Sequence, residues 1–209
     1  AMASQALAYY DPKVDTFFIV KDLGPAALGE VMLHELEHAI QAQRFGLVAL
    51  QAALMGKDQS DRLEALRFLW EGEATFVMLR PQLGRVKEPH LSKLLRAQAD
   101  AVVHTPFAQL LKLQELQMRM SGAKDIAAQM EATRKIPPFL LRGLQLAYVG
   151  GAAAIQAVHS ARGWAGVDAL WTRPPTSTEQ TLHPEKLMAE PREEPVEVPM
   201  PALDPVLGD

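Results

Sequence analysis

The pattern of apolar residues points this chain toward a mainly helical fold with one small β element. Residues 9–20 (YYDPKVDTFFIV) place aromatic and β-branched residues around a turn-forming Asp11-Pro12 pair, which predicts a strand or a hairpin. No other stretch gives a strong strand signal. From about Pro25 onward the apolar residues recur with helical spacing, and prolines and glycines mark the breaks. We therefore expect a mainly α (α+β) chain whose β element lies near the N-terminus.

The breaks divide the rest of the chain into helices and irregular segments. Asp61 and Glu64 have the spacing of a capping box, and Pro81 is expected to end the helix that they open. Between the first two helices, QRFGLVALQAALMGKD is expected to hold a loop and a short helix. The predicted helices are 25–44, 60–80, 89–103, 106–120, a piece after 121–125, then 137–162 and 164–171.

The 209 residues, of which 48% are apolar, are enough for one well-packed domain, which we place at residues 1–189. Within it, residues 172–186 (TRPPTSTEQTLHPEK) have the composition of an irregular loop. Residues 190–209 are rich in proline and acidic side chains, which predicts an extended or disordered tail.

Bulk composition excludes several classes of function. The chain has no cysteine, so disulfides, thiolate metal sites and cysteine nucleophiles are excluded. Its net charge is −4 and its basic residues are scattered, which argues against a nucleic-acid partner. No apolar run approaches the roughly 20 residues of a membrane span. The first ten residues do not form an intact signal peptide, and localisation stays open between cytoplasm and export.

The motif HELEH at residues 34–38 carries the strongest chemical signal. On a helix with about 100° per residue, His38 falls about 40° from His34, and Glu35 about 100° from it. Two imidazoles one turn apart can bind one zinc ion, and the carboxylate next to the first can reach its bound water. The alternative is an ordinary solvated polar stripe that also includes Glu30, Glu37 and Gln41. The apolar residues of this helix, which are expected to face the core, are Met32, Leu33, Leu36, Ala39 and Ile40.

A second informative stretch is LWEGEATFVML at residues 69–79. It is apolar on nearly every side, which predicts a buried helix, and a buried carboxylate needs a partner. Glu71 and Glu73 are about 200° apart around such a helix, so they cannot both reach one metal ion. The helical wheel alone mildly favours Glu73. The alternative to a metal ion as partner is an ion pair with Arg67 or Arg80.

Together the two stretches resemble the gluzincin metallopeptidases, the thermolysin and alanyl-aminopeptidase type, in which H-E-x-x-H is followed by a glutamate ligand on a helix. Residues 71–74 (EGEA) fit the E-G-x-A phrase of the aminopeptidase branch, whose first glutamate is the ligand. The resemblance therefore implies Zn²⁺ held by His34, His38 and Glu71, with Glu35 as general base. Gly72 would then let its helix approach the metal-binding helix closely.

The resemblance also leaves one role open and suggests another. The aspartate that follows the ligand in thermolysin-like proteins is replaced by Thr75, so Glu73 or Glu37 is left to orient the histidines. Gluzincins of this type place a histidine or tyrosine near the zinc to stabilise the oxyanion, and His183 is the candidate for that role. The alternative is that His183 and Pro184 merely cap a turn.

Longer pieces of the sequence, YYDPKVDT, HELEHA, EGEAT and PPTSTEQTLHPEK, look like a group of uncharacterised bacterial zinc-peptidase-like proteins. This similarity spans residues 9–186 and implies a zincin-like fold, with a strand before the active-site helix that could hold a peptide in extended form. We therefore expect a zinc metallopeptidase that acts on peptide or protein substrates. The competing hypothesis is a non-catalytic helical interaction protein, for which apolar surface on residues 137–162 and the tail would suit a partner.

Overall fold

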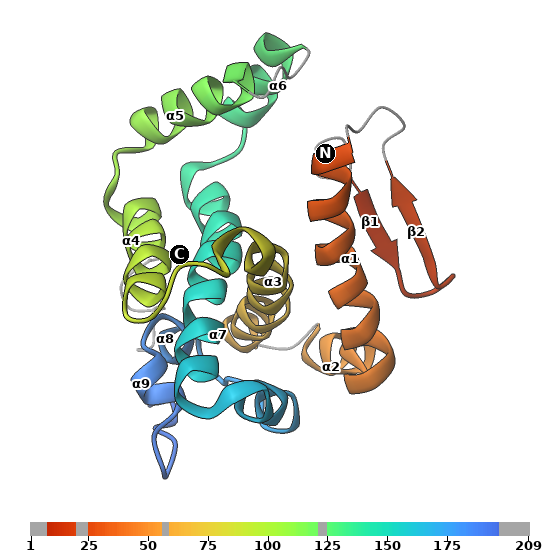
Figure 1. Cartoon of the computed structure of the whole chain (residues 1–209), viewed down its shortest axis with the longest axis vertical. Coiled ribbons are helices and arrows are strands. Elements are labelled where there is room, and N and C mark those ends of the chain that lie inside the picture. The colour runs from red at the N-terminus through yellow and green to blue at the C-terminus, as the bar shows by residue number, and fades with distance from the viewer. Residues whose placement is uncertain (1–7, 20–24, 56–58, 121–124, 197–209) are drawn as a thin grey trace, which may run out of the picture.

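The computed structural model describes residues 8–19, 25–55, 59–120 and 125–196, and over these ranges the chain is mainly helical (Figure 1). Its β element is an antiparallel hairpin of β1 (Ala8–Asp11) and β2 (Thr16–Ile19), in which Tyr10 lies opposite Phe17. A small β element near the N-terminus of a mainly helical chain was predicted, and this prediction is confirmed.

The helices follow the predicted breaks with two corrections. The prediction of an irregular loop at 172–186 is wrong in part, because two short helices form within or at the end of this segment. Pro81 does not end its helix; only two residues follow it, so its missing N–H affects only the last turn. The helices are α1 (Pro25–Phe45), α2 (Leu47–Leu54), α3 (Ser60–Leu83), α4 (His90–His104), α5 (Phe107–Met120), α6 (Ile126–Arg134), α7 (Pro138–Thr172), α8 (Thr178–Leu182) and α9 (Pro184–Leu187).

Asp61 does not form the predicted capping box. The residue before α3 is Gln59, and the first turn of α3 has no side-chain cap. The Asp61 carboxylate instead accepts hydrogen bonds from the backbone N–H and the hydroxyl of Thr178, the latter at 2.6 Å. Asp61 therefore holds the start of α8 against α3, a long-range contact that sequence spacing could not reveal.

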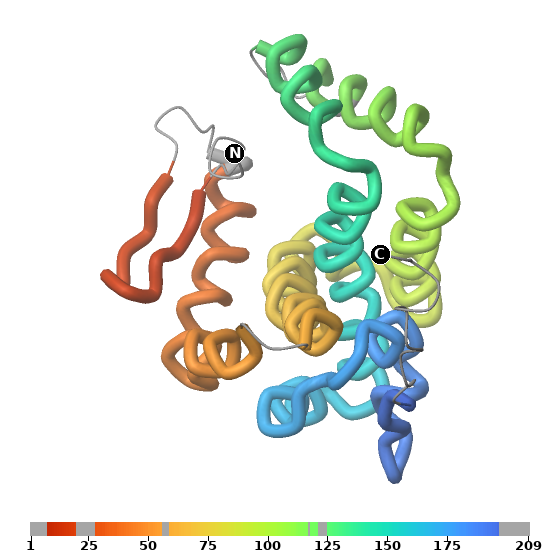
Figure 2. The backbone as a smooth tube through the Cα atoms, turned by 180° about the vertical axis from the view of Figure 1, so that it is seen from behind, coloured from red at the N-terminus to blue at the C-terminus, as the bar shows by residue number. Residues whose placement is uncertain are grey.

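The elements are arranged in a row, with the hairpin outside α1, then α3, then α7 and α4 (Figures 1 and 2). At the centre, α3 and α7 cross at Gly72 and Gly151, where a Cβ on Gly72 would lie 2.3 Å from the Gly151 carbonyl carbon. The expected role of Gly72 is thus corrected: the glycine brings α3 close to α7, not to α1. The main core cluster includes Leu66, Leu69, Phe76, Ile155, Val158 and Trp171.

Helix α7 merges the two predicted helices 137–162 and 164–171, which are separated only by a kink at Gly163 (φ 63°, ψ −168°). Among the described helices it is the one long and apolar enough to cross a membrane, a test that the core helix of a folded domain also passes. It packs against both α3 and α4. The expectation that the chain has no membrane span stays a prediction.

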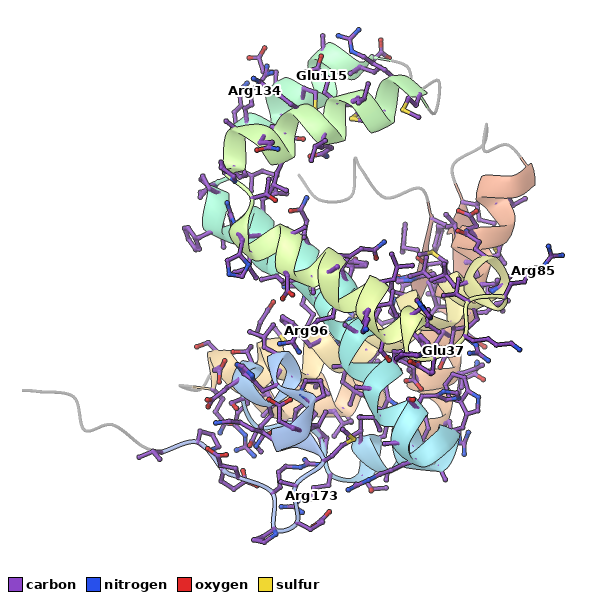
Figure 3. All side chains as sticks on the ribbon, turned by 60° about the vertical axis from the view of Figure 1, so that its left-hand side comes forward. Glu37, Arg85, Arg96, Glu115, Arg134 and Arg173 are labelled. Atoms are coloured by element: carbon purple, nitrogen blue, oxygen red, sulfur yellow. The ribbon has the colours of Figure 1, made fainter. Side chains whose placement is uncertain are left out.

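The predicted tail can be followed from Glu190 to Val196. These residues form neither helix nor strand, and the remainder of the tail lies outside the described residues. Their side chains make ion pairs with the body of the chain. Arg173, labelled in Figure 3, lies near Glu190 and Glu194, and Lys186 pairs with Glu193 at 2.9 Å.

Candidate metal centre

Helix α1 turns its polar face, not its apolar face, toward α3. Glu35 is 8% exposed and Gln41 is fully buried, whereas Leu36 and Ile40 are 43% and 46% exposed. The expectation that Leu36 and Ile40 face the core is therefore wrong. The polar residues are turned inward because α3 supplies partners for His34, His38 and Gln41, and β1 supplies one for Glu35. These contacts override the apolar pattern.

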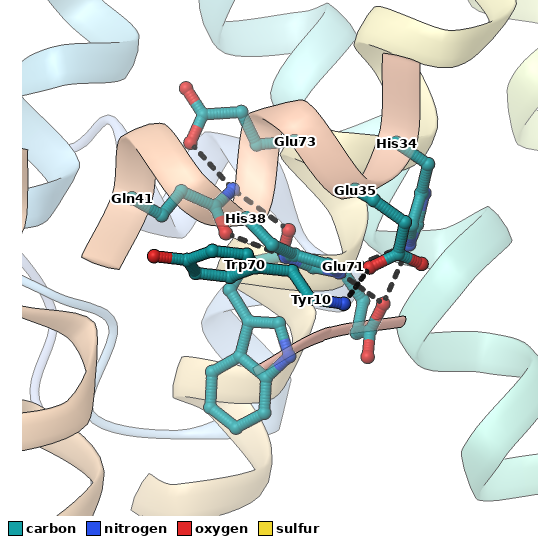
Figure 4. Close-up of polar contacts among 8 residues, drawn as sticks. All are labelled: Tyr10, His34, Glu35, His38, Gln41, Trp70, Glu71 and Glu73. Carbon is teal, nitrogen blue, oxygen red and sulfur yellow. Dashed lines mark hydrogen bonds and ion pairs between the residues drawn. The ribbon is translucent and has the colours of Figure 1, made fainter. Parts of the chain in front are cut away.

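The two histidines of HELEH meet Glu71 of α3 in one cluster (Figure 4). The Nε2 atoms of His34 and His38 lie 3.1 Å apart. The Glu71 Oε2 atom lies 3.2 Å from the first and 3.4 Å from the second. The solvated-stripe alternative is excluded for His34 and Gln41, because both are buried. The structure thus brings together the three residues expected to bind metal, and Glu73 is not among them.

The geometry of the cluster fits a tetrahedral metal ion. Four ligands about 2.0–2.1 Å from a zinc ion lie at the corners of a tetrahedron whose edges are about 3.3 Å long. The three distances among His34, His38 and Glu71 are 3.1, 3.2 and 3.4 Å. Three corners of such a tetrahedron are therefore present, and the group could hold a metal ion with one position left open.

The charges of the cluster reinforce one another. Burial by itself raises the pKa of Glu71, but hydrogen bonds to His34 and His38 outweigh it and hold that pKa well below its usual range. Burial disfavours protonation of His38, yet the hydrogen bond and charge of Glu71 raise the pKa of this imidazole. Glu71 is therefore an ionised carboxylate, which is the form that binds a cation.

Glu73 points away from the cluster and is hydrogen-bonded to neutral groups. The sequence analysis required a partner for any buried glutamate, and these groups supply it. Its Oε2 atom accepts hydrogen bonds from Trp171 Nε1 at 2.8 Å and from Gln41 Nε2 at 3.2 Å. Burial, followed by repulsion from Glu37, raises the pKa of Glu73 to about 7. The alternative of ion pairs with arginine is wrong. Arg67 pairs with Glu64, and Arg80 lies over the ring of Phe76.

Glu35 lies at the edge of the cluster and is fixed by the hairpin. Its Oε2 atom accepts a hydrogen bond of 2.8 Å from the backbone N–H of Tyr10 in β1 (Figure 4). This contact attaches β1 to α1 and restricts the carboxylate to one orientation. The negative charge of Glu35 also contributes to the raised pKa of His38, so the two groups are electrostatically coupled.

Tyr148 of α7 is a site residue that the sequence analysis missed. Its ring stacks on His34, with centroids 5.8 Å apart and planes 13° apart. Burial and then the charge of Glu71 raise the pKa of its phenol, which therefore stays protonated near neutral pH. The available signal was a single tyrosine in the largely apolar segment 137–162. Nothing in the sequence linked that residue to HELEH.

His183 is not brought to the cluster. It is the residue between α8 and α9, and its Nδ1 atom lies 3.3 Å from Glu185 Oε1. It lines a groove between α4, α7 and α8 together with Leu146 and Gly150. Each of these two α7 residues is about 200° around the helix from Tyr148. His183 thus lies beside the face of α7 opposite to the one that contacts His34.

Comparison of the chain with known protein families, with characterised proteins and with solved structures found no match. The similarity to gluzincins stays a prediction that rests on the motifs.

Proposed function

We propose that this chain is a zinc-dependent metallohydrolase and, by its motifs, a peptidase. The observation that carries the proposal is the cluster of His34, His38 and Glu71, whose mutual distances match the edges of a zinc tetrahedron. Two imidazoles and one carboxylate form the donor set of catalytic zinc sites, which keep a fourth position open. A zinc ion bound there would lower the pKa of a water molecule and polarise the scissile carbonyl.

Glu35 is the proposed general base. Its carboxylate takes a proton from the attacking water and later gives it to the leaving amine. The hydrogen bond from the Tyr10 backbone N–H keeps one carboxylate oxygen occupied and the group oriented. The strand expected to hold a peptide substrate is thus already tied to the proposed base, which makes the hairpin part of the catalytic arrangement.

Tyr148 replaces His183 as the proposed donor to the oxyanion. A hydrogen-bond donor for this role must stay protonated at working pH and must lie beside the metal ligands. The raised pKa of Tyr148 and its stacking on His34 meet both requirements. His183 does not meet the second requirement, because it contacts Glu185 on the other side of α7.

The proposal is tested with two measurements on the purified protein. Elemental analysis should find close to one zinc ion per chain, or zinc titration should reach that ratio. A peptide library should then be cleaved by the native protein, and the Glu35→Gln protein should bind zinc equally well but cleave on the order of a hundredfold more slowly or worse. Wild-type turnover by Glu35→Gln would remove Glu35 from the mechanism, and absence of zinc binding would refute the site.

A non-catalytic interaction protein is the second candidate, and one observation favours it. The outer face of α1 and the hairpin expose several large apolar side chains, which is typical of surfaces that contact a partner. These residues are Tyr9, Phe18, Ile19, Leu36 and Ile40. Of the apolar surface expected on residues 137–162, the part carried by Ala152, Ile155 and Val158 is used within the core, whereas Phe139 and Leu140 are exposed. A purified protein that contains no zinc and binds none on titration would support this candidate.

A further inference from the structure

We infer that Gln41 fixes the tautomer of His38, because its amide is locked in one orientation by the backbone carbonyl of Trp70. Gln41 is thus a positioning residue: it acts through His38. The side chain is fully buried, although it lies three residues after His38 on the polar side of α1. Its contacts, shown in Figure 4, join α1 to α3.

The orientation of the amide follows from its partners. One end of the Gln41 side chain lies 3.0 Å from the Trp70 carbonyl oxygen and 3.2 Å from Glu73 Oε2. A peptide carbonyl can only accept a hydrogen bond, so the atom facing it must be the NH₂ group of the amide. The other end, which lies 2.9 Å from His38 Nδ1, must then be the amide oxygen.

This orientation dictates where the proton of the imidazole sits. An amide oxygen can only accept, so His38 Nδ1 must carry the hydrogen. A neutral imidazole carries one ring proton, which leaves the lone pair on Nε2. That atom faces His34 Nε2 at 3.1 Å and Glu71 Oε2 at 3.4 Å. The relay from Trp70 through Gln41 therefore holds His38 in the form whose Nε2 can bind a metal ion.

His34 provides an internal contrast. Its Nδ1 atom is buried and has no hydrogen-bond partner among the described residues. Its ring is instead held between Tyr148, stacked at 5.8 Å, and His38, edge-on at 4.6 Å. On the Nδ1 side, the structure thus holds His38 by a hydrogen bond and His34 by ring packing. The hydrogen bond of His34 to Glu71 is made at Nε2, the nitrogen that faces the metal position, whereas the hydrogen bond of His38 to Gln41 is made at Nδ1.

The relay extends to the third helix of the core. Trp171 Nε1 donates to the same Glu73 oxygen that Gln41 contacts, at 2.8 Å, and the ring of Phe45 stacks on Trp171 at 5.0 Å. Glu73 is therefore held by α7 while it accepts from Gln41. This contact gives the second glutamate of EGEA a role in the site without binding metal.

The experiment measures the ring nitrogen shifts of His38 in the metal-free protein by long-range ¹H–¹⁵N correlation, over a series of rising pH values that is continued until the shifts are those of a neutral imidazole. We expect the Nδ1–H form of His38 in the native protein. Gln41→Met keeps the side-chain length but removes the amide, and it should move His38 toward the Nε2–H form. The control is Gln43→Met on the same helix, because Gln43 is exposed and its side chain contacts Tyr10 and Asp15 of the hairpin.

Two outcomes would overturn the inference. One is an Nε2–H form of His38 in the native protein, a result that needs no variant and so cannot be confused with misfolding. The other is an unchanged tautomer in folded Gln41→Met. A merely structural role of Gln41 would alter stability but not the tautomer.

The consequence for metal binding rests on the proposed function and is measured separately. Partners of this kind change metal affinity by about 10- to 100-fold, so zinc affinity of Gln41→Met should fall by that factor, and that of Gln43→Met should not. A shifted tautomer with unchanged zinc affinity would overturn the link between the relay and the metal. If the native protein binds no zinc, the proposed function fails, and the tautomer of His38 still decides the inference.

Discussion

Glu71 and Glu73 lie two residues apart on α3, and both are largely buried, yet their charges are controlled in opposite directions. Two imidazoles hold the pKa of Glu71 well below its usual range, whereas burial raises the pKa of Glu73 to about 7. The difference lies in the partners. Glu71 faces groups that can carry positive charge, and Glu73 faces the neutral N–H groups of Trp171 and Gln41. Burial alone therefore does not decide whether a carboxylate can serve as a metal ligand.

The largest expected effect is a loss of zinc affinity on replacing Glu71, which replacement of Glu73 should cause only to a small extent. Structural zinc sites bind with about 10–16 kcal/mol, so removing one of three protein ligands should cost about 4 kcal/mol, or on the order of a thousandfold in affinity. We expect this loss for Glu71→Ala and about tenfold or less for Glu73→Ala. Competition with a chromophoric chelator measures both. Weaker binding by Glu73→Ala than by Glu71→Ala would reverse the assignment of the ligand.

The next effect concerns the pH dependence of stability through Glu73. Its pKa is about 7 in the folded protein against 4.5 for an unperturbed glutamate, so the folded state binds the proton more tightly. Stability is fully present below about pH 4.5 and is lost as pH rises to about 7, by up to about 3 kcal/mol. Glu73→Gln stays neutral, so it should gain stability relative to the native protein across this range.

Denaturant unfolding of both metal-free proteins at pH 4.5 and pH 8 checks this prediction. Glu71→Gln is the matched control and should be less stable than the native protein, whereas Glu73→Gln should be more stable. The reason is that the pKa of Glu71 is lowered, so its ionised form stabilises the fold. An equal difference between native protein and Glu73→Gln at both pH values would show that folding does not raise the pKa of Glu73.

A third prediction compares the residue beside Glu71 with one on the far side of α7. Tyr148→Phe removes the proposed oxyanion donor but keeps the ring that stacks on His34, so kcat should fall about a hundredfold while zinc stays bound. His183→Ala should leave kcat within about a factor of two. Steady-state kinetics on a peptide found in the library digest measure both. A larger loss for His183→Ala would restore the assignment made from sequence.

The smallest effect concerns the glycine between the two glutamates. Gly72→Ala would place a Cβ 2.3 Å from the Gly151 carbonyl carbon, so we expect a loss of about 2 kcal/mol in the free energy of unfolding. Gly143→Ala on α7 is the control, because a Cβ there meets nothing within 4 Å and should add up to about 1 kcal/mol. Thermal or denaturant unfolding measures both. A neutral Gly72→Ala would show that α3 and α7 can separate at no cost.

The sequence was sufficient for local features and for the cluster itself. Helical spacing and the stop at Gly46 predicted α1, since both depend on neighbouring residues, and the spacing of HELEH placed His34 and His38 on one face. Matching residues 71–74 to a motif chose Glu71 over Glu73, although the helical wheel mildly favoured Glu73. Here the motif was a better guide because an almost wholly apolar helix has no well-defined inner face.

The parts that the sequence did not predict depend on contacts between distant segments. The sequence offered Gln41 only a place in the alternative solvated stripe, because its partners, the Trp70 carbonyl and Glu73, lie on another helix. Leu36 and Ile40 were placed in the core by their apolar character, yet the polar contacts of α1 turn them outward. Tyr148 could not be assigned because its relation to His34 depends on how α7 crosses α3.

That crossing also determines how tolerant the site is to change. Where Gly72 and Gly151 meet, the two backbones touch without side chains between them, so no rotamer can absorb a displacement. Glu71 precedes one of these glycines by one residue, and Tyr148 precedes the other by three. The distance between Glu71 and Tyr148 is therefore set by the contact between the two backbones. A change of side-chain size elsewhere in the core of α3 and α7 should therefore disturb this distance less than a change at either glycine.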